Sequence, residues 1–267
     1  MTTIGIVGAA GRMGRLIAAA IQRTPTATLG GALEYEGNAA LGSDMGALAG
    51  IGNLGIAVGT DREALFAVCD VVIDFSLPES TRLSLDAAVR HGTALLIGTT
   101  GLSAEDHALI DAAGEKIAVL QAANTSLGVN VLVELVRQAA ATLDADFDIE
   151  IVEAHHRHKV DAPSGTALAL GQAAAEGRGI NLETNSVRSR DGHTGPRPEG
   201  SIGFATVRGG DVAGEHDVLF LGEGERITLG HVATNRAIFA NGAVKGAMWL
   251  AGQKPGRYTM KQVLGLG

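Results

Sequence analysis

Cysteine is almost absent from this sequence, because Cys69 is the only one among 267 residues. A single thiol forms no internal disulfide and supplies no cysteine cluster for a structural zinc ion. We therefore expect a reducing compartment and a Cys69 side chain that packs as a small buried hydrophobic group. No basic segment precedes the first apolar run, Ile4-Gly5-Ile6-Val7, so no signal peptide is predicted and a cytoplasmic location is the default.

Positive charge and long apolar runs are also scarce. The chain has 21 Lys and Arg against 29 Asp and Glu, a formal net charge of −8, which leaves no positive field for a nucleic acid or an anionic membrane. The longest uncharged stretches, such as residues 45–60, are rich in glycine or interrupted by polar residues and predict no membrane-spanning helix. The composition predicts a globular protein without nucleic-acid or membrane partners.

Glycine, by contrast, is abundant. The chain has 38 glycines, about twice the average usage, and only nine aromatic residues (Phe 6, Tyr 2, Trp 1). Such a chain depends on tight turns and close backbone approach, which is typical of nucleotide-binding α/β proteins.

The first half alternates between short β-branched runs and alanine-rich helical stretches. Strands are predicted at residues 4–7, 26–33, 56–58, 71–75, 95–97 and 117–120, and helices at 12–23, 80–91 and 104–116. Runs such as Val71-Val72-Ile73 are apolar on both faces, as in a parallel sheet that helices cover on each side. This pattern predicts an α/β fold with a doubly wound parallel sheet.

A glycine-rich loop, Gly8-Ala9-Ala10-Gly11-Arg12-Met13-Gly14, lies where the first strand ends and the first helix begins. In this context the pattern is a candidate dinucleotide-binding fingerprint, and the sheet is expected to be Rossmann-like. Gly8 would make the turn, Gly11 would admit phosphates to the helix N-terminus, and Gly14 would let helix and sheet pack closely. Ala10 stands where the commoner fingerprint has its second glycine.

Glu34 ends the second predicted strand, 20 residues after Gly14. A carboxylate at this place accepts hydrogen bonds from the adenosine ribose, which favours NAD over a 2′-phosphorylated cofactor. The next residue, Tyr35, carries no charge, so a 2′-phosphate would need another cation such as Arg12. These residues predict use of NADH or NADPH with a leaning towards NADH.

Two more loops follow later strands of the same sheet, Gly98-Thr99-Thr100-Gly101 and Ala122-Ala123-Asn124-Thr125. Ligands bind at the carboxyl ends of strands in open α/β sheets. The small residues and hydroxyls of these loops suit the nicotinamide end of a dinucleotide, although a plain turn would look the same for either loop alone.

The second half has a different pattern, which predicts an α+β domain. Helices are expected at residues 129–143, 166–175 and 235–251, and strands at 147–151, 186–190, 202–208, 216–221 and 226–231. We expect an open, mixed and mostly antiparallel sheet with one face poorly covered within a single chain. Such a face usually meets a partner subunit, so oligomerisation is predicted.

The chemistry is concentrated between residues 153 and 166, Glu-Ala-His-His-Arg-His-Lys-Val-Asp-Ala-Pro-Ser-Gly-Thr, where three histidines, an arginine and a lysine occupy positions 155–159. So many cationic groups together predict an anionic ligand. His156 and His158 could instead ligate a metal, but the adjacent Arg157 and Lys159 oppose a dication, so no metal is predicted. Ser164 would cap a helix whose N-terminus can bind a carboxylate.

These motifs resemble the 4-hydroxy-tetrahydrodipicolinate reductase family, also called dihydrodipicolinate reductase. The resemblance runs over essentially the whole chain and is most specific in residues 153–166. It also covers the glycine loop, residues 98–101, and the segments Ser189-Arg190-Asp191-Gly192-His193-Thr194-Gly195, Gly203-Phe204-Ala205-Thr206-Val207-Arg208 and Phe239-Ala240-Asn241-Gly242-Ala243.

The resemblance implies a cytoplasmic homotetramer of lysine and diaminopimelate biosynthesis. It would use NADH or NADPH to reduce a cyclic imine dicarboxylate, 4-hydroxy-tetrahydrodipicolinate, to tetrahydrodipicolinate with loss of water. By the family pattern His155 and Lys159 are catalytic proton-transfer residues. The substrate contacts implied are His156, Gly165 and Thr166, and the cofactor contacts implied are Gly8, Ala9, Ala10, Gly11, Arg12, Met13, Glu34, Gly98, Thr99, Thr100, Ala122, Ala123, Asn124 and Thr125.

We therefore expect residues 1–126 with 236–267 to form the dinucleotide-binding domain and residues 127–235 to form the substrate-binding and oligomerisation domain. Many relatives carry an arginine where Tyr35 stands here, which argues against a strong NADPH preference. Two alternatives stay open at this point: another Rossmann-type nicotinamide oxidoreductase, and a dinucleotide-sensing binding protein without catalysis.

Overall fold

The computed structural model describes residues 1–266, which fold into two compact units. Unit 1 contains Met1–Leu127 and the described residues from Ala237 onward, and unit 2 is Gly128–Arg236. Each unit has its own sheet and its own hydrophobic core. Within residues 1–266, no helix combines the length and the apolarity that a membrane crossing requires.

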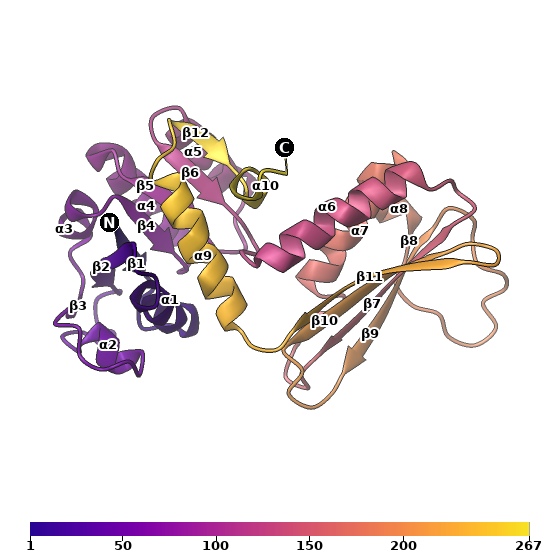
Figure 1. The fold of residues 1–267 in the computed structure, drawn as a ribbon, viewed down its shortest axis with the longest axis horizontal. Coiled ribbons are helices and arrows are strands. Elements are labelled where there is room, and N and C mark those ends of the chain that lie inside the picture. Colours follow the sequence, from indigo (N-terminus) through magenta and orange to yellow (C-terminus); the bar gives the residue numbers. More distant parts are fainter. Residues whose placement is uncertain (267) are drawn as a thin grey trace. The chain divides into compact units, whose positions relative to one another are not determined.

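Unit 1 is built on a seven-stranded parallel sheet with the order β3-β2-β1-β4-β5-β6-β12 (Figure 1). Its strands are β1 (Thr2–Val7), β2 (Ala27–Leu33), β3 (Val58–Gly59), β4 (Val71–Asp74), β5 (Ala94–Ile97), β6 (Ala118–Gln121) and β12 (Gly256–Tyr258). The first six strands have the order of a Rossmann sheet, and β12 extends it beside β6. Every residue of β4 and β5 is buried, as their continuous apolar runs predict.

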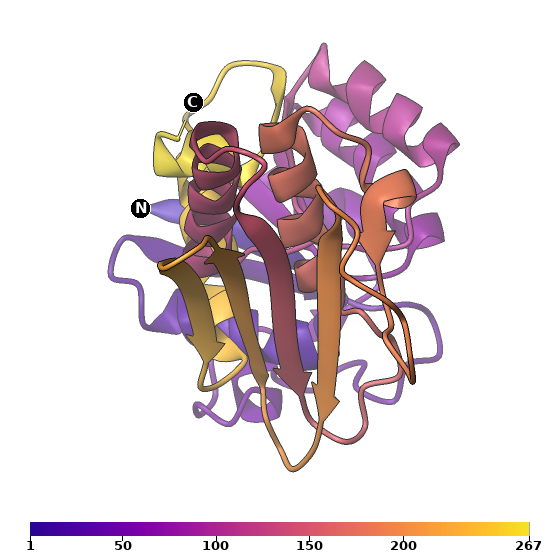
Figure 2. The same ribbon diagram turned by 90° about the vertical axis from the view of Figure 1, so that its right-hand side faces the viewer.

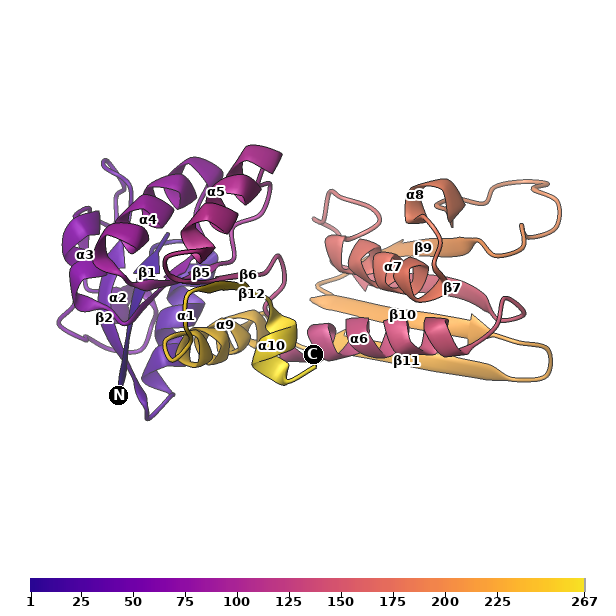
Figure 3. The same ribbon diagram turned by 90° about the horizontal axis from the view of Figure 1, so that it is seen from above.

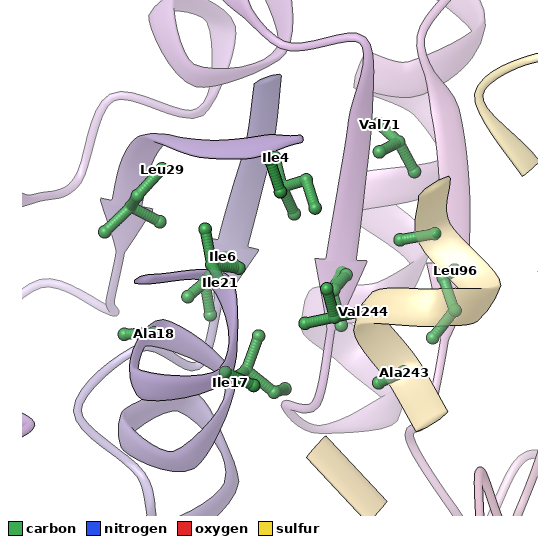
Figure 4. Packing of buried hydrophobic residues seen from close by; sticks show 14 of the residues in the cluster. Ile4, Ile6, Ile17, Ala18, Ile21, Leu29, Val71, Leu96, Ala243 and Val244 are labelled. Carbon is green, nitrogen blue, oxygen red and sulfur yellow. The ribbon is translucent and has the colours of Figure 1, made fainter. Parts of the chain in front are cut away.

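Helices cover both faces of this sheet. They are α1 (Arg12–Gln22), α2 (Met45–Leu48), α3 (Arg62–Val68), α4 (Pro78–His91), α5 (Ala104–Gly114), α9 (Ala237–Leu250) and α10 (Met260–Leu264). One core layer joins α1 and α9 to the sheet, with Ile17 and Ile21 of α1 beside Ile6 of β1 (Figure 4). The other layer joins α3, α4 and α5 to the opposite face. The doubly wound architecture is confirmed.

Two small residues are tightly packed in this unit, and the burial of Cys69 was predicted. Cys69 is buried, and burial, followed by the nearby charge of Asp70, raises the pKa of its thiol to about 12. Gly242 brings α9 against the chain before α6, because a Cβ atom there would lie 1.8 Å from the carbonyl oxygen of Thr125. The sequence did not predict the short elements α2, α3, α10 and β12, whose few residues carry little periodic signal.

Unit 2 contains a five-stranded mixed sheet with the order β11-β10-β7-β9-β8, whose strands lie side by side in Figure 2. The strands are β7 (Asp148–His155), β8 (Ser186–Val187), β9 (Ile202–Arg208), β10 (Gly214–Leu221) and β11 (Arg226–Ala233). The helices are α6 (Leu127–Thr142), α7 (Gly165–Arg178) and α8 (Leu182–Asn185). Figure 3 shows α6 and α7 along the same side of the strands.

The sheet is mixed and more of its residues pair antiparallel than parallel, as predicted. β10 pairs antiparallel with β7 and β11, whereas β9 pairs parallel with both β7 and β8. The parallel part follows from the connection between β7 and β9, because α7 and α8 carry the chain back across the sheet and β9 begins at the same end as β7. β7 also continues four residues beyond the predicted end at residue 151, which places Glu153 and His155 on a strand.

Strand alternation separates the two faces of this sheet. Ile149 and Ile151 of β7 point into the core beneath α6 and α7, together with Phe220 of β10. The opposite face keeps exposed apolar side chains, including Val207 of β9, 54% exposed, and Val232 of β11, 62% exposed. The open mixed sheet predicted for the second half of the chain is therefore present.

Candidate active site

Strand register in unit 2 brings polar and ionisable side chains into two adjacent rows. In the first row, His216 of β10 pairs with Glu153 of β7, and Glu153 pairs with Thr206 of β9. In the second row, His155 pairs with Arg208. Paired residues project from the same face of a sheet, so these groups, contributed by three strands, gather on one side. Glu153 and His216 are almost fully buried, at 1% and 4% exposed.

Glu153 is the centre of this cluster. Its Oε2 accepts hydrogen bonds from His155 Nδ1 and Arg208 Nη1, both at 2.7 Å. Its Oε1 accepts from Arg208 Nη2 at 2.7 Å, from the Ser164 backbone N–H at 3.0 Å and from Thr206 Oγ1 at 3.3 Å. Burial raises the pKa of Glu153, but the hydrogen bonds from Arg208, His155 and Ser164 outweigh burial and lower it to about 2. Glu153 is therefore an anion throughout the physiological range.

His155 is held in one protonation pattern at Nδ1. Because an ionised carboxylate only accepts hydrogen bonds, the contact with Glu153 assigns the proton to Nδ1. The other ring nitrogen, Nε2, has no hydrogen-bond partner among residues 1–266, and a Cβ atom on Gly214 would approach it to 3.0 Å. The His155 side chain is 11% exposed. Nε2 is therefore the ring atom left for a ligand.

His216 lies behind this cluster and contacts the start of α7. Ser164 caps α7 and its Oγ accepts a hydrogen bond from the Ala167 N–H at 3.1 Å, while His216 Nε2 lies 2.9 Å from the same oxygen. Burial, then the nearby charge of His155, lowers the pKa of His216 to about 4. His216 is consequently neutral at pH 7, and its Nε2 shares a hydrogen bond with the Ser164 hydroxyl.

The loop after β7 carries the remaining predicted acid/base group. Lys159 Nζ donates to both carboxylate oxygens of Asp161, at 2.7 and 2.8 Å. The backbone of this loop is fixed to the segment after β9, since the His156 N–H donates to the Val212 carbonyl at 2.8 Å. Partial burial and the charges of Arg236 and His158 lower the pKa of His156. Positive groups thus crowd this loop, as anion binding requires.

The N-terminus of α7, where the sequence predicts carboxylate binding, lies in the same unit. Gly165 opens the helix and is exposed, and a Cβ atom there would meet nothing within 4 Å. Thr166 follows in the first turn, where the helix dipole favours negative charge. Glu153 positions this turn through Ser164 and positions His155 through Nδ1. One buried carboxylate therefore joins the predicted proton-transfer and carboxylate-binding groups.

The described residues do not assemble a metal-ligand cluster. Within residues 1–266, no group of three or more His, Cys, Asp or Glu side chains is arranged to hold a metal ion. The rings of His156 and His158, the candidate ligands weighed from the sequence, have centroids 6.2 Å apart.

Unit 1 contains a cavity of about 860 Å³ at the carboxyl ends of β1, β2 and β4. Its lining includes four of the predicted cofactor residues, Gly8, Ala10, Gly11 and Glu34. Glu34 is 9% exposed, and its carboxylate accepts hydrogen bonds from the Ala10 N–H at 2.8 Å and from Asn38 Nδ2 at 3.1 Å. The acid predicted to meet the ribose is thus fixed beside the glycine loop.

The glycine loop has the local geometry that its sequence predicts. Gly8 has φ +77°, and a Cβ atom there would lie 2.5 Å from the carbonyl oxygen of Phe75. Gly14 packs closely, because its Cβ would lie 2.4 Å from the carbonyl oxygens of Gly8 and Ala9. Gly11 caps α1 without a side-chain hydrogen bond to the first turn. The N-terminus of α1 is therefore shaped to accept a phosphate.

Other predicted cofactor residues lie around this cavity rather than on its wall. Ala9 is buried in the core, Met13 packs against the same core, and Arg12 is exposed. Thr99 is buried, and its Oγ1 accepts from the N–H of Ser76, a cavity residue, at 3.1 Å.

The two loops predicted to meet the nicotinamide end also contain both buried and exposed residues. Gly98 lies against the Phe75 ring, which a Cβ atom at Gly98 would approach to 2.2 Å, while Thr100 is exposed. In the loop after β6, Ala122 donates its N–H to the Ile97 carbonyl at 3.0 Å, and Thr125 Oγ1 donates to the Phe239 carbonyl at 2.7 Å. Ala123 is exposed and Asn124 is half-buried.

The residues present fit a bound dinucleotide. The cavity has the volume of a ligand site, a side chain at Gly8 or Gly14 would collide with neighbouring backbone, and a buried carboxylate stands where the sequence predicts the ribose contact. Unit 2 separately holds the predicted proton-transfer residues and the N-terminus of α7. The fold and the two sites together define a dinucleotide-dependent oxidoreductase with a separate unit for an anionic substrate.

Comparison with known proteins identifies the family. The family described as "Dihydrodipicolinate reductase, N-terminus" matches residues 2–125, and "Dihydrodipicolinate reductase, C-terminus" matches residues 128–264. A 4-hydroxy-tetrahydrodipicolinate reductase of Methylocella silvestris is 55% identical over 262 residues, 98% of this chain and 96% of that protein. A protein of the same name from Alkalilimnicola ehrlichii is 54% identical over 265 residues, 99% of each chain.

A solved structure agrees with these relatives. It is a dipicolinate-bound dihydrodipicolinate reductase from Paenisporosarcina sp. TG-14, with a TM-score of 0.77, 25% identity and coverage of 97% of both chains. The chain described here therefore belongs to the dihydrodipicolinate reductase family, and the resemblance inferred from its motifs is confirmed.

Sequence reasoning named His155, Lys159 and the α7 terminus but assigned no role to Glu153, Arg208 or His216. Strand alternation puts Glu153 on the same face as His155 and could have drawn attention to it. Arg208 and His216 offered no such signal, since only the strand register brings them beside Glu153, 55 and 63 positions earlier in the chain.

Proposed function

We propose that this chain reduces (2S,4S)-4-hydroxy-2,3,4,5-tetrahydrodipicolinate to (S)-2,3,4,5-tetrahydrodipicolinate with NADH or NADPH, releasing water, in lysine and diaminopimelate biosynthesis. The observation that carries the proposal is the cluster in unit 2, where His155, Lys159 and the start of α7 provide proton-transfer and anion-binding groups together. Family membership over the full chain supports the same reaction and disfavours both alternatives considered from the sequence.

The residues of unit 2 have complementary roles in this proposal. A bound reduced nicotinamide supplies the hydride. Departure of the ring hydroxyl as water needs a proton on that oxygen and releases one from the neighbouring ring carbon, and the electron density that develops after hydride addition must be quenched by a proton, so one proton is consumed overall. His155 and Lys159 transfer these protons, and His155 does so through Nε2, which first takes up a proton and then passes it on. Gly165 and Thr166 bind one substrate carboxylate at the helix terminus, and His156 contacts the other end of the dianion.

In unit 1 we assign cofactor contacts to the predicted loop residues around the cavity. The residues on the cavity wall, Gly8, Ala10, Gly11 and Glu34, contact the pyrophosphate and the ribose. The other predicted positions, Ala9, Arg12, Met13, Gly98, Thr99, Thr100, Ala122, Ala123, Asn124 and Thr125, support these contacts or meet the nicotinamide end.

NADH should be at least as good a cofactor as NADPH. Glu34 and Glu36 both line the cavity beside Tyr35, so two carboxylates face the place where a 2′-phosphate would sit. Arg15 lines the same cavity, but its Nε donates to the Ala10 carbonyl at 2.9 Å. Repulsion by the carboxylates therefore opposes the additional phosphate.

The active form is proposed to be a cytoplasmic homotetramer assembled through the sheets of unit 2. Val207 and Val232 support this assembly because they leave apolar surface on the face of the sheet opposite α6 and α7. Sedimentation equilibrium of the purified chain measures the assembly directly, and a mass of one subunit at micromolar concentration would exclude it.

The decisive test of the reaction is the loss of absorbance at 340 nm. The substrate is generated freshly by condensation of pyruvate with aspartate semialdehyde, and NADH and NADPH are compared in parallel. Oxidation that depends on this substrate is expected, and it should fall by about 10²-fold or more in Lys159→Met and His155→Gln. Folded protein that binds NADH but oxidises it with no added substrate dependence would refute the reaction.

The same assay tests the cofactor preference. The ratio of kcat/KM for NADH to that for NADPH should be one or greater. A tenfold advantage for NADPH, equivalent to about 1.4 kcal/mol, would contradict the argument from Glu34 and Tyr35.

A further inference from the structure

Glu153 and Arg208 form an ion pair that takes no part in the proton transfer or the substrate binding proposed above. Arg208 spans both oxygens of Glu153 with two hydrogen bonds of 2.7 Å, a bidentate geometry that fixes the carboxylate plane. Arg208 Nη2 also donates to the Asp161 carbonyl at 2.7 Å, which ties the pair to the loop that carries Lys159. Its side chain is 20% exposed against 1% for Glu153.

We propose that Glu153, fixed by Arg208, is the positioning residue that keeps the His155 proton on Nδ1 and presents bare Nε2 to the substrate. The inference rests on the proposed function, in which His155 transfers a proton. Glu153 acts through His155 and does not itself contact the reacting atoms. The same carboxylate holds the α7 terminus through the Ser164 N–H, so it sets the relative position of both groups.

The hydrogen-bond partners of Glu153 differ in whether they can only donate or can also accept. Arg208 and the Ser164 N–H are donors only, so both carboxylate oxygens must accept. His155 is the one ring partner at Oε2, and an imidazole nitrogen can either donate or accept. With an anion at Glu153 that nitrogen must donate, and the neutral ring then has its lone pair on Nε2.

Glu153→Gln is expected to change the tautomer of His155. An amide has one acceptor and one donor end, and each end meets a group that already donates. At the Oε1 position the amide NH₂ would face two groups that cannot accept, Arg208 Nη2 at 2.7 Å and the Ser164 N–H at 3.0 Å, against one hydroxyl that can, Thr206 Oγ1, at the longer distance of 3.3 Å. At the Oε2 position it would face Arg208 Nη1 and His155, and His155 can switch to accepting. The second orientation wins, and it moves the neutral His155 proton to Nε2.

This orientation also separates proton transfer from substrate binding. The glutamine carbonyl stays on the Oε1 side and still accepts from Ser164, so the α7 terminus keeps its place. We therefore expect kcat to fall by about 10²-fold in Glu153→Gln, the scale of a general acid or base contribution. The KM for the dicarboxylate should change by less than about threefold, because substrate binding keeps its contacts.

Glu150→Gln is a matched control on the same strand. Glu150 is also a partly buried carboxylate paired with two arginines, Arg190 at 2.8 Å and Arg197 at 2.9 Å, but it projects from the opposite face of β7. Its substitution removes the same charge from an arginine-paired site without touching His155. Both kcat and the state of the His155 ring should match the wild type in this variant.

The test combines steady-state kinetics with two-bond ¹H–¹⁵N correlation spectra of ¹⁵N-histidine-labelled protein at alkaline pH. The His155 signals are assigned by their loss in His155→Gln. The wild type should give the Nδ1–H tautomer and Glu153→Gln the Nε2–H tautomer, with the fall in kcat described above. An unchanged tautomer in Glu153→Gln, or a changed tautomer with kcat within threefold of the wild type, would overturn the proposal.

Glu153→Asp keeps the test open if Glu153→Gln does not fold. The shorter carboxylate remains an anion and only accepts, so the Nδ1–H tautomer should persist while kcat falls less than in the amide variant. Wild-type kcat in Glu153→Asp would contradict the need for this placement. The spectra require no turnover: a wild type without substrate-dependent oxidation refutes the proposed reaction, whereas the tautomer comparison judges the positioning role alone.

Discussion

Replacing His216 with glutamine should remove a large part of the acid sensitivity of this protein. Burial, then the charge of His155, lowers the pKa of folded His216 from its ordinary value of 6.5 to about 4. Between these values the unfolded chain binds a proton that the folded chain does not. The free energy of unfolding therefore falls as the pH drops from about 6.5 to about 4, and this contribution is fully present only above that window.

The size of the effect follows from the width of the window. At about 1.36 kcal/mol for each pH unit, the difference between 6.5 and about 4 corresponds to about 3 kcal/mol. His216 is only 4% exposed, so solvent screening reduces this figure little. Glutamine does not titrate and carries an acceptor that can replace Nε2 opposite Ser164 Oγ, which the wild-type ring approaches to 2.9 Å.

The assay is urea unfolding followed by circular dichroism at several pH values from 4.5 to 7.5. All measurements use one protein concentration, because assembly contributes to apparent stability. The wild type should lose about 2–3 kcal/mol more than His216→Gln across the window.

His231 on the neighbouring strand β11 allows a comparison with a less buried histidine. His231 pairs with His216 in the sheet register, and burial lowers its pKa as well, but it is less buried. His231→Gln should therefore reduce the slope by a smaller amount. Parallel stability curves for the wild type and His216→Gln would refute the reasoning, since they would mean that His216 gains no protons on unfolding.

Three further predictions concern other parts of the chain. Gly8→Ala should lower the free energy of unfolding by at least about 2 kcal/mol and abolish NADH binding in fluorescence titrations, because φ is +77° and the Cβ would meet the Phe75 carbonyl oxygen at 2.5 Å. Gly37→Ala is the control, since Gly37 has φ +88° but nothing within 4 Å of its Cβ position, and it should show the backbone strain alone. Glu153→Gln should lessen the loss of stability between pH 4.5 and about 2, where the wild-type carboxylate takes up its proton on unfolding; equal slopes in urea titrations would contradict this. Phe66→Ala, at a side chain 1% exposed, should lower the free energy of unfolding by about 3–5 kcal/mol, and a loss below 1 kcal/mol would show that the site collapses around the gap.

The sequence was most informative where neighbours in the chain are also neighbours in space. The glycine loop is one such case: Gly8 and Gly11 lie between β1 and α1, Gly14 lies in the first turn of α1, and Gly8 and Gly14 make the turn and the close packing that their spacing predicts. Strands β4 and β5 are another, because continuous apolar runs are stable only when buried on both faces. Glu34 was also placed correctly, since it ends a strand adjacent to the loop.

Prediction was incomplete where contacts between distant strands mattered. The sequence predicted a mixed, mostly antiparallel sheet in unit 2, but it did not show that the crossover through α7 and α8 makes β9 parallel to β7. The predicted end of β7 at residue 151 was four residues too early. Glu153 is polar and was taken as part of a loop, yet it is buried on a strand because Arg208 and His155 satisfy its charge.

The sequence by itself therefore determined where the two candidate sites lie: a predicted dinucleotide loop, from glycine spacing at a strand–helix junction, and a predicted acid/base and anion-binding segment, from the residue types at 153–166. Tertiary structure decided how the second site is organised. Arg208 follows Glu153 by 55 positions, and only parallel pairing of β9 with β7 brings its guanidinium to both carboxylate oxygens. Local sequence fixes which groups are available, but the protonation pattern of His155 depends on contacts that strand register alone creates.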